Sequence, residues 1–229
     1  MPDLYDSLDG QVALVTGANR GIGAEIARGL RDLGATVYAG SRSMQEETPD
    51  GTERVLLDVT QEGDIESVVD GIFEETGRLD VLVNNAGVGE FGETIVSESV
   101  ETIDRTLATN LRGPMLVCKH ALPLLLQQEH PRVVNVSSGM GAIHDMGDGA
   151  PAYRVSKTGL NGFTRYLDAE YAEKGLVANA ACPGHVETDL ATEGAERTPE
   201  EGAETPVWLA RFRDGPSGKF WRDEEQIEW

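Results

Sequence analysis

The chain has 229 residues, which is enough for one well-packed α/β domain and short for two. Hydrophobic residues make up 39% of it, and no apolar run approaches the roughly 18 residues that a membrane span needs. Acidic residues outnumber basic ones by 40 to 19, which gives a formal net charge of −21. Such a charge repels nucleic acid and anionic membranes, so neither is an expected partner.

The basic residues are mostly arginines, and the only lysines are Lys119, Lys157, Lys174 and Lys219. Acidic excess joined to lysine avoidance resembles proteins from organisms with high intracellular salt. Self-repulsion destabilises the compact state unless counterions screen it, and molar salt shortens the Debye length to about 3 Å. We therefore expect a halophilic protein, with an ordinary acidic enzyme as the alternative.

The N-terminal residues Met-Pro-Asp-Leu-Tyr-Asp are acidic and lack a signal-peptide pattern, so we expect a cytoplasmic protein. Cys118 and Cys182 are the only cysteines and neither belongs to a CxxC pair. This argues against a disulfide framework and a zinc site, and it favours buried, inert thiols. Asp145 and Asp148 flank His144 only loosely, so no metal site is expected there.

Strand and helix patterns alternate along the chain, which predicts a doubly wound Rossmann-type α/β fold in a single domain spanning residues 1–229. About seven mainly parallel strands are expected, at Val12–Thr16, Thr36–Ala39, Arg54–Leu57, Val81–Asn84, Arg132–Val136, Val177–Ala181 and Lys219–Trp221. Helices are expected at Ile22–Leu33, Gln61–Thr76, Val100–Gln128, Tyr153–Glu173 and Pro199–Arg211. The unpatterned segments are candidate pocket walls, and residues 188–198 are expected to form a substrate lid.

The stretch from Thr16 to Gly23 lies where the first long strand gives way to a helix, with glycines at Gly17, Gly21 and Gly23. Glycines let a backbone approach a ligand closely, and the free N–H groups of a helix start favour a pyrophosphate. The spacing Gly-x3-Gly-x-Gly differs from the commonest dinucleotide fingerprint. Alone, it is equally compatible with a plain tight turn.

In a Rossmann-type fold, a carboxylate at the end of the strand that follows the glycine turn and its helix would accept hydrogen bonds from the ribose hydroxyls of NAD. This strand end holds Ser41 and Arg42 and no carboxylate. A hydroxyl and the guanidinium groups of Arg42 and Arg20 suit a 2′-phosphate, which favours NADP(H) over NAD. Glu46 and Glu47 are interpreted as solvated surface charges.

Tyr153 and Lys157 are four residues apart, so they share one face of a predicted helix. A positive charge there stabilises a phenolate. Bringing a tyrosine pKa from about 10 toward neutrality takes roughly 4 kcal/mol, which a lysine and a cationic nicotinamide ring together could supply.

Five motifs in order resemble the short-chain dehydrogenase/reductase family: Thr16-Gly17-x3-Gly21-x-Gly23, Asn84-Asn85-Ala86-Gly87, Ser138, Tyr153-x3-Lys157 and Pro183-Gly184-x3-Thr188. The resemblance spans nearly the whole chain. Residues 182–189 and 199–207 are also similar to those of NADPH-dependent carbonyl reductases within that family. The motifs together are far more specific than the glycine turn alone.

The resemblance implies that Tyr153 is the general acid, which protonates a carbonyl oxygen while a hydride arrives from nicotinamide. It implies that Ser138 hydrogen-bonds this oxygen, that Lys157 holds the ribose hydroxyls and lowers the pKa of Tyr153, and that Asn110 positions a proton-relay water. Two alternatives remain open: Asn110 as an ordinary polar helix residue, and Ser137 in place of Ser138.

The resemblance also implies contacts of Thr188 with the carboxamide, Asp58 with adenine and Asn85 with the adenosine ribose, although Asp58 is also explicable as a turn residue. The full set expected at the cofactor is Gly17, Asn19, Arg20, Gly21, Ile22, Gly23, Ser41, Arg42, Asp58, Val59, Asn85, Ala86, Gly87, Tyr153, Lys157, Pro183, Gly184, Val186 and Thr188. The set expected at the substrate is Ser138, Met140, Tyr153 and His185, with His144 and Met146 as further candidates. Both histidines are also explicable as ordinary loop residues.

Two departures from the family pattern matter. The fifteen positions from Ser138 to Tyr153 are slightly more than many members have, so the segment between them is expected to bulge over the pocket. The long insertion that keeps animal carbonyl reductases monomeric is missing, so a homodimer or homotetramer through the helices around 100–128 and 153–173 is expected.

The function that this implies is NADP(H)-dependent interconversion of a small carbonyl compound and its alcohol. The enzymatic alternative is 3-oxoacyl-carrier-protein reductase, which uses the same catalytic set but would favour a basic patch. An alternative of another class is a non-catalytic NADP(H) sensor, against which the intact Ser138, Tyr153 and Lys157 count.

Overall fold

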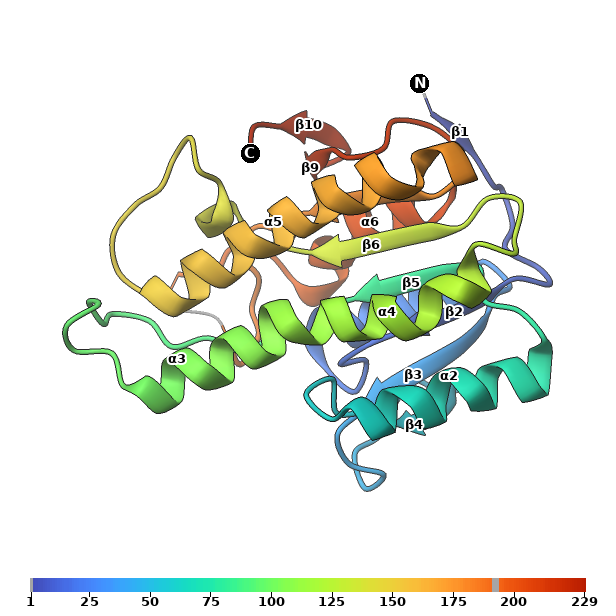
Figure 1. Cartoon of the computed structure of the whole chain (residues 1–229), viewed down its shortest axis with the longest axis horizontal. Coiled ribbons are helices and arrows are strands. Elements are labelled where there is room, and N and C mark those ends of the chain that lie inside the picture. The colour runs from blue at the N-terminus through green and yellow to red at the C-terminus, as the bar shows by residue number, and fades with distance from the viewer. Residues whose placement is uncertain (1, 191–193) are drawn as a thin grey trace.

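The computed structural model describes residues 2–190 and 194–229. Its centre is an eight-stranded sheet in the order β10-β9-β7-β6-β5-β2-β3-β4 (Figure 1). The strands are β2 (Val12–Val15), β3 (Thr36–Ser41), β4 (Glu53–Leu56), β5 (Val81–Asn84), β6 (Arg132–Val136), β7 (Val177–Ala181), β9 (Phe220–Arg222) and β10 (Glu225–Ile227). Seven are parallel as predicted, and β10 adds an antiparallel edge.

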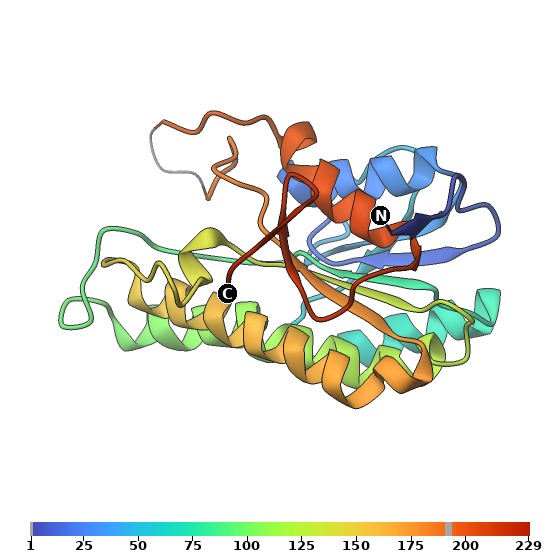
Figure 2. The same cartoon turned by 90° about the horizontal axis from the view of Figure 1, so that it is seen from above.

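Helices cover both faces of the sheet, as Figure 2 shows from above. They are α1 (Gly21–Asp32), α2 (Glu62–Thr76), α3 (Val100–Leu107), α4 (Gly113–Leu125), α5 (Pro151–Tyr171) and α6 (Pro199–Ala210). One face packs against α1 and α6, and the other against α2, α4 and α5. This is the doubly wound arrangement that the alternating patterns predict.

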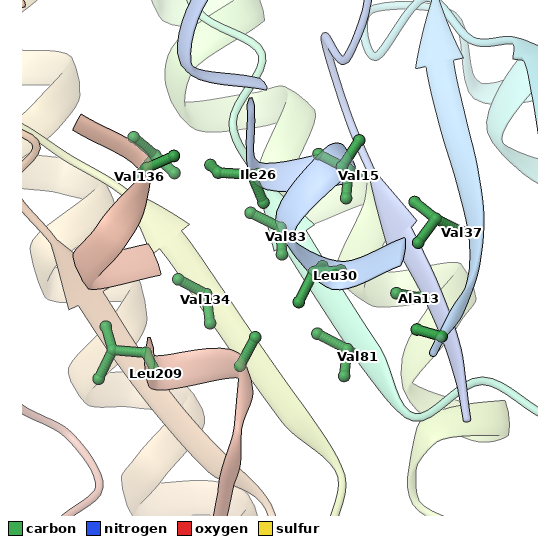
Figure 3. Packing of buried hydrophobic residues seen from close by; sticks show 14 of the residues in the cluster. Ala13, Val15, Ile26, Leu30, Val37, Val81, Val83, Val134, Val136 and Leu209 are labelled. Carbon is green, nitrogen blue, oxygen red and sulfur yellow. The ribbon is translucent and has the colours of Figure 1, made fainter. Parts of the chain in front are cut away.

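Alternation within the central strands divides the core in two. Ala13 and Val15 of β2 lie in the cluster with Ile26 and Leu30 of α1 (Figure 3), whereas Leu14 lies in the opposite cluster. The strands β2, β5, β6 and β7 are buried on both faces, so they are predominantly apolar and lack a regular polar alternation. None of the described helices is long and apolar enough to cross a membrane.

The helix predicted over Val100–Gln128 is interrupted. A π-helical segment, Ala108–Arg112, separates α3 from α4, and α4 ends at Leu125. A π-turn inserts an extra residue into the helix, and such turns gather at functional sites. Here the segment contains Asn110.

Two short features lie outside the predicted elements. The strands β1 (Asp3–Leu4) and β8 (Phe212–Asp214) form a separate antiparallel pair. Residues 42–52 cross from β3 to β4 without a helix, in agreement with the absence of any pattern over 43–51.

The carboxyl ends of β5 and β6 point to one edge of the sheet, where the loops that follow these strands gather (Figure 1).

Candidate active site

A cavity of about 1450 Å³ lies at the carboxyl ends of the parallel strands. It exceeds the ~300–1,000 Å³ of drug-sized pockets, so it has room for a dinucleotide and a substrate. All residues predicted at the cofactor and substrate line it except Ser41. The loops from 87–89, 138–140 and 182–190 form its walls.

The glycine turn is held in shape by Asn85. The Nδ2 of Asn85 donates to the carbonyl oxygens of Thr16 at 3.0 Å and Gly17 at 3.1 Å. A Cβ on Gly23 would stand 2.1 Å from the Gly17 oxygen and 2.3 Å from this Nδ2, and Gly17 itself has φ +65°. Only glycine fits either position, so the cradle suits a closely approaching phosphate. The side-chain amide nitrogen of Asn85 is therefore already hydrogen-bonded to the turn.

The adenosine end differs from the prediction at Ser41. Its side chain is 1% exposed and hydrogen-bonds to the Glu46 carboxylate and, at 3.1 Å, to the Ser43 carbonyl. It is therefore not available to a 2′-phosphate. Glu46, interpreted from sequence as a solvated charge, is half-buried and lines the cavity with Arg42. The loop 42–52 folds back on the end of β3, and this brings the Glu46 carboxylate to the wall of the cavity.

Arg20 lines the cavity, and its Nη1 forms an ion pair with Asp189. Both side chains are largely exposed, at 65% and 69%. Thr188 lies next to Gly21, since a Cβ there would meet its Cγ2 at 3.2 Å. The first residues of the predicted lid thus rest on the glycine turn, whereas residues 191–193 of that segment lie outside the described part of the chain.

Asp58 is half-buried beside Val59 at the cavity wall. Its Oδ1 accepts the Thr60 N–H at 2.9 Å and the Thr60 hydroxyl at 2.7 Å. This is the turn geometry that the alternative interpretation expects, and it still leaves Asp58 facing the cavity.

Ser138 and Tyr153 come from different elements and meet at the cavity. Ser138 follows β6 and its Oγ accepts the Met140 N–H at 3.2 Å, while Tyr153 lies in the first turn of α5 with its hydroxyl near enough to Ser138 for that serine to lower its pKa. Ser137 also lines the cavity, but the residue is 2% exposed and its Oγ donates to Asn161 Oδ1 at 2.6 Å. The geometry therefore favours Ser138 as the hydroxyl that a substrate meets.

Lys157 is 4% exposed, and its Nζ donates to the Val136 carbonyl at 2.8 Å while lying 5.7 Å from the centre of the Tyr153 ring. Burial lowers the pKa of Lys157 to about 8. The pKa of Tyr153 is raised above its usual value, because burial outweighs the hydrogen bond from Ser138. The lowering of the Tyr153 pKa by Lys157 together with a cationic nicotinamide ring stays a prediction.

Asn110 is not among the residues that line the cavity, and its predicted role in positioning a relay water stays a prediction. It is 0% exposed; its Oδ1 accepts the Val88 N–H at 2.8 Å and its Nδ2 donates to the Val88 carbonyl at 2.7 Å. Asn110 and Lys157 both approach Gly87, since a Cβ there would lie 3.5 Å from Asn110 Oδ1 and 3.6 Å from Lys157 Nζ. The π-turn therefore aims Asn110 at the loop behind Lys157.

Several site residues carry no pattern in the sequence. The Phe91 ring packs edge-on against Tyr153 at 5.2 Å. The buried Glu98 carboxylate accepts the Ala152 N–H at 3.0 Å, which caps α5 one residue before Tyr153. Cys182 and Arg222 also line the cavity. These contacts span distant parts of the chain, so no local signal could have shown them.

Met140 and His185, which are predicted at the substrate, line the cavity. His144 lies elsewhere, with its backbone N–H donating to the Trp229 carbonyl at 3.0 Å, and Met146 is an exposed side chain outside the cavity lining. The segment before Tyr153 reaches the cavity through Asp148, Gly149 and Ala150.

Glu62, Glu66 and His120 bring ligand-type atoms within 4.8 Å of one another on α2 and α4. Lys119 also binds the Glu62 carboxylate, and these partners lower the pKa of Glu62 to about 2. Because a lysine belongs to the group, we interpret it as an ion-pair cluster that joins the two helices and not as a cation site.

Residues 11–199 match the family model of the short chain dehydrogenases. The chain is a member of this family. It is 33% identical to NADPH carbonyl reductase 1 of Rattus norvegicus, with 97% of this chain and 100% of the relative covered. It is 34% identical to a 3-oxoacyl-acyl-carrier-protein reductase of Thermotoga maritima, with 95% and 87% covered.

The fold is also that of solved family members. A carbonyl reductase from chicken fatty liver, with NADPH bound, superimposes with a TM-score of 0.86 at 28% identity, covering 97% of this chain and 100% of the other. The chain is therefore an oxidoreductase of a family that uses nicotinamide cofactors and acts on carbonyl or alcohol groups.

Proposed function

We propose that this protein is an NADP(H)-dependent carbonyl reductase or alcohol dehydrogenase in which Tyr153 is the general acid and base. The observation that carries the proposal is the meeting of the Tyr153 and Ser138 hydroxyls at the wall of a cavity whose far end is the glycine turn. The likeness to carbonyl reductases supports it.

A nicotinamide cofactor bound along the glycine turn supplies the hydride for this chemistry. Ser138 orients the carbonyl oxygen by hydrogen bonding, and Tyr153 donates its proton to that oxygen. The phenol holds this proton at neutral pH, as an acid must, because the ordinary pKa of a tyrosine, about 10, already lies well above 7. Lys157 keeps a positive charge close to the ring and stabilises the phenolate that results.

The preference for NADP(H) rests on Arg20 and Arg42, whose guanidinium groups line the adenosine end. Glu46 opposes it, since a carboxylate repels a 2′-phosphate. We therefore expect a preference for NADPH over NADH in kcat/KM that increases in Glu46→Gln by up to about fivefold. A wild type that prefers NADH, or a Glu46→Gln variant with a weaker preference for NADPH, contradicts this assignment.

NADPH oxidation with ketones, aldehydes, quinones and acetoacetyl thioesters in molar KCl tests the activity directly. Turnover of simple ketones supports a carbonyl reductase. Exclusive turnover of acetoacetyl carrier-protein thioesters supports the 3-oxoacyl-carrier-protein reductase, a function that one relative carries. Tight NADPH binding without any turnover supports the sensor.

We also propose that the enzyme is a cytoplasmic homo-oligomer. Val155 and Tyr166 on α5 are 59% and 54% exposed, and Met115 on α4 is 47% exposed, so these helices present apolar side chains that a second copy would cover. Light scattering after size-exclusion chromatography in molar KCl tests this, and a monomer contradicts it.

A further inference from the structure

Arg222, the last residue of β9, places a guanidinium group in the wall of the cavity. Its Nε and Nη2 donate to the Cys182 sulfur at 3.3 and 3.0 Å. Its Nη2 also lies 2.5 Å from where a Cβ on Gly139 would stand, so the group is pressed against the turn that follows Ser138. A side chain at 139 would therefore displace the guanidinium from this position.

Within residues 2–190 and 194–229, no carboxylate forms an ion pair with Arg222, whereas Arg197 pairs with the adjacent Asp223. A thiol is a weak acceptor, and an arginine carries five N–H donors in a planar fork that matches a carboxylate. In a chain with 40 acidic residues, a half-buried arginine held only by a thiol is a group prepared for an external anion.

The anion must be attached close to the reacting carbonyl. Gly139 directly follows Ser138, and its N–H donates at 3.1 Å to the same Cys182 sulfur that accepts from Arg222. The guanidinium is therefore next to the turn that begins at Ser138, and Tyr153 lines the same cavity. A carbonyl oxygen bonded by Ser138 and an anion bonded by Arg222 can thus belong to the same small molecule.

We propose that Arg222 binds the carboxylate of the substrate, and that the natural substrates are short oxo acids or hydroxy acids with the carboxylate one or two bonds from the reacting carbon. This rests on the proposed carbonyl reductase function. Hydride and proton transfer are unchanged: the C=O bond gains a hydride at carbon and the Tyr153 proton at oxygen, and the carboxylate takes no part. Arg222 sets specificity through charge and geometry.

The test uses two matched pairs, acetoacetate with methyl acetoacetate and 2-oxobutanoate with methyl 2-oxobutanoate. Binding to the complex of the enzyme with NADP⁺ is measured by calorimetry in 2 M KCl, and kcat/KM with NADPH is measured beside it. We expect at least one acid to bind and react about 10- to 100-fold better than its ester in the wild type. In Arg222→Gln the acid falls to the level of its ester, whose own values stay within about twofold.

Arg213→Gln on β8 is the matched control, because Arg213 is exposed and outside the cavity lining. It removes the same charge and is expected to keep the preference. Equal binding of acids and esters by the wild type overturns the proposal. An equal loss for both in Arg222→Gln also overturns it, since that pattern assigns Arg222 to holding Cys182. A failure of turnover with every compound refutes the reductase function, while the binding measurement still decides on Arg222.

Discussion

The two ends of the cavity hold positive charge in different ways. At the glycine turn, Arg20 is 65% exposed and paired with Asp189. At the Tyr153 end, Lys157 is 4% exposed and donates to a backbone carbonyl, and Arg222 donates to a thiol; neither forms an ion pair in the part of the chain that the structure describes. The exposed Arg20 has a counterion of its own, whereas the buried Lys157 and the half-buried Arg222 have none among the described residues.

This difference predicts where substitutions are costly. An exposed ion pair contributes little and is screened by salt, so its partner exchanges readily for a phosphate. A buried, unpaired cation destabilises the fold and persists where a ligand or a reaction needs it. The larger effects are therefore expected at the Tyr153 end and the smaller, salt-dependent ones at the turn.

The largest effect is expected for Tyr153→Phe. It removes the proton donor and leaves the ring that packs against Phe91, so kcat should fall by about 10²- to 10⁴-fold or below detection, with NADPH binding nearly unchanged. Steady-state kinetics and fluorescence titration measure the two quantities. Retained turnover would place the proton donor elsewhere.

A stability gain is expected for Lys157→Met. The pKa of Lys157 falls from 10.5 to about 8, so the charged form costs about 3 kcal/mol below pH 8. The unfolded chain binds more protons between pH 8 and 10.5, so wild-type stability rises with pH across that window. The variant should be the more stable at pH 7, and its advantage should shrink toward pH 10.

Urea unfolding at pH 7 and pH 10 in molar KCl checks this. Lys174→Met is the control, because Lys174 is exposed on the surface and should show no such pH dependence. An advantage of Lys157→Met that is the same at both pH values would show that the charge is not its source.

Arg20→Gln and Asp189→Asn form a matched pair at the exposed end. Loss of the guanidinium should weaken NADPH binding about 10- to 100-fold and leave NADH almost unaffected, because only NADPH has the 2′-phosphate. Loss of Asp189 should tighten NADPH binding by at most about fivefold at low salt and by less in molar KCl. Weaker NADPH binding in Asp189→Asn would show that the ion pair supports NADPH binding and does not compete with it.

The smallest effect on stability for each single charge is expected from the screening of the acidic surface by salt. Because the net charge is −21, the melting temperature should rise from low to molar KCl by at least about 4 °C, equivalent to about 1–2 kcal/mol. Differential scanning calorimetry in a KCl series measures it, with equal ionic strengths of NaCl for comparison. A melting temperature that does not rise would show that the acidic excess is not a salt adaptation.

The buried strands were the most predictable part of the fold. Val81–Asn84, Arg132–Val136 and Val177–Ala181 were predicted with the bounds that the structure has, because strands covered on both faces are continuous apolar runs. The edge strand β10 and the π-turn at 108–112 were not predicted. The first is short and polar, and the second has the same apolar periodicity as the helices around it.

The candidate site likewise has residues that the sequence predicts and contacts that it does not. Residues that follow strand ends, such as Asn85 and Ser138, could be located from the motifs because parallel strands bring their carboxyl ends together. The pairing of Ser41 with Glu46 depends on how one loop folds back, and Arg222 reaches the cavity from the far edge of the sheet. Neither contact has a local signature.

Hydride transfer itself is tested by NADPH that carries deuterium at the transferring C4 position, incubated with methyl acetoacetate in molar KCl. We predict that each turnover places one deuterium on the new alcohol carbon, and that Tyr153→Phe forms no labelled alcohol while still binding the cofactor. Oxidation of NADPH without deuterium on that carbon, or labelled alcohol from Tyr153→Phe at the wild-type rate, would contradict the mechanism.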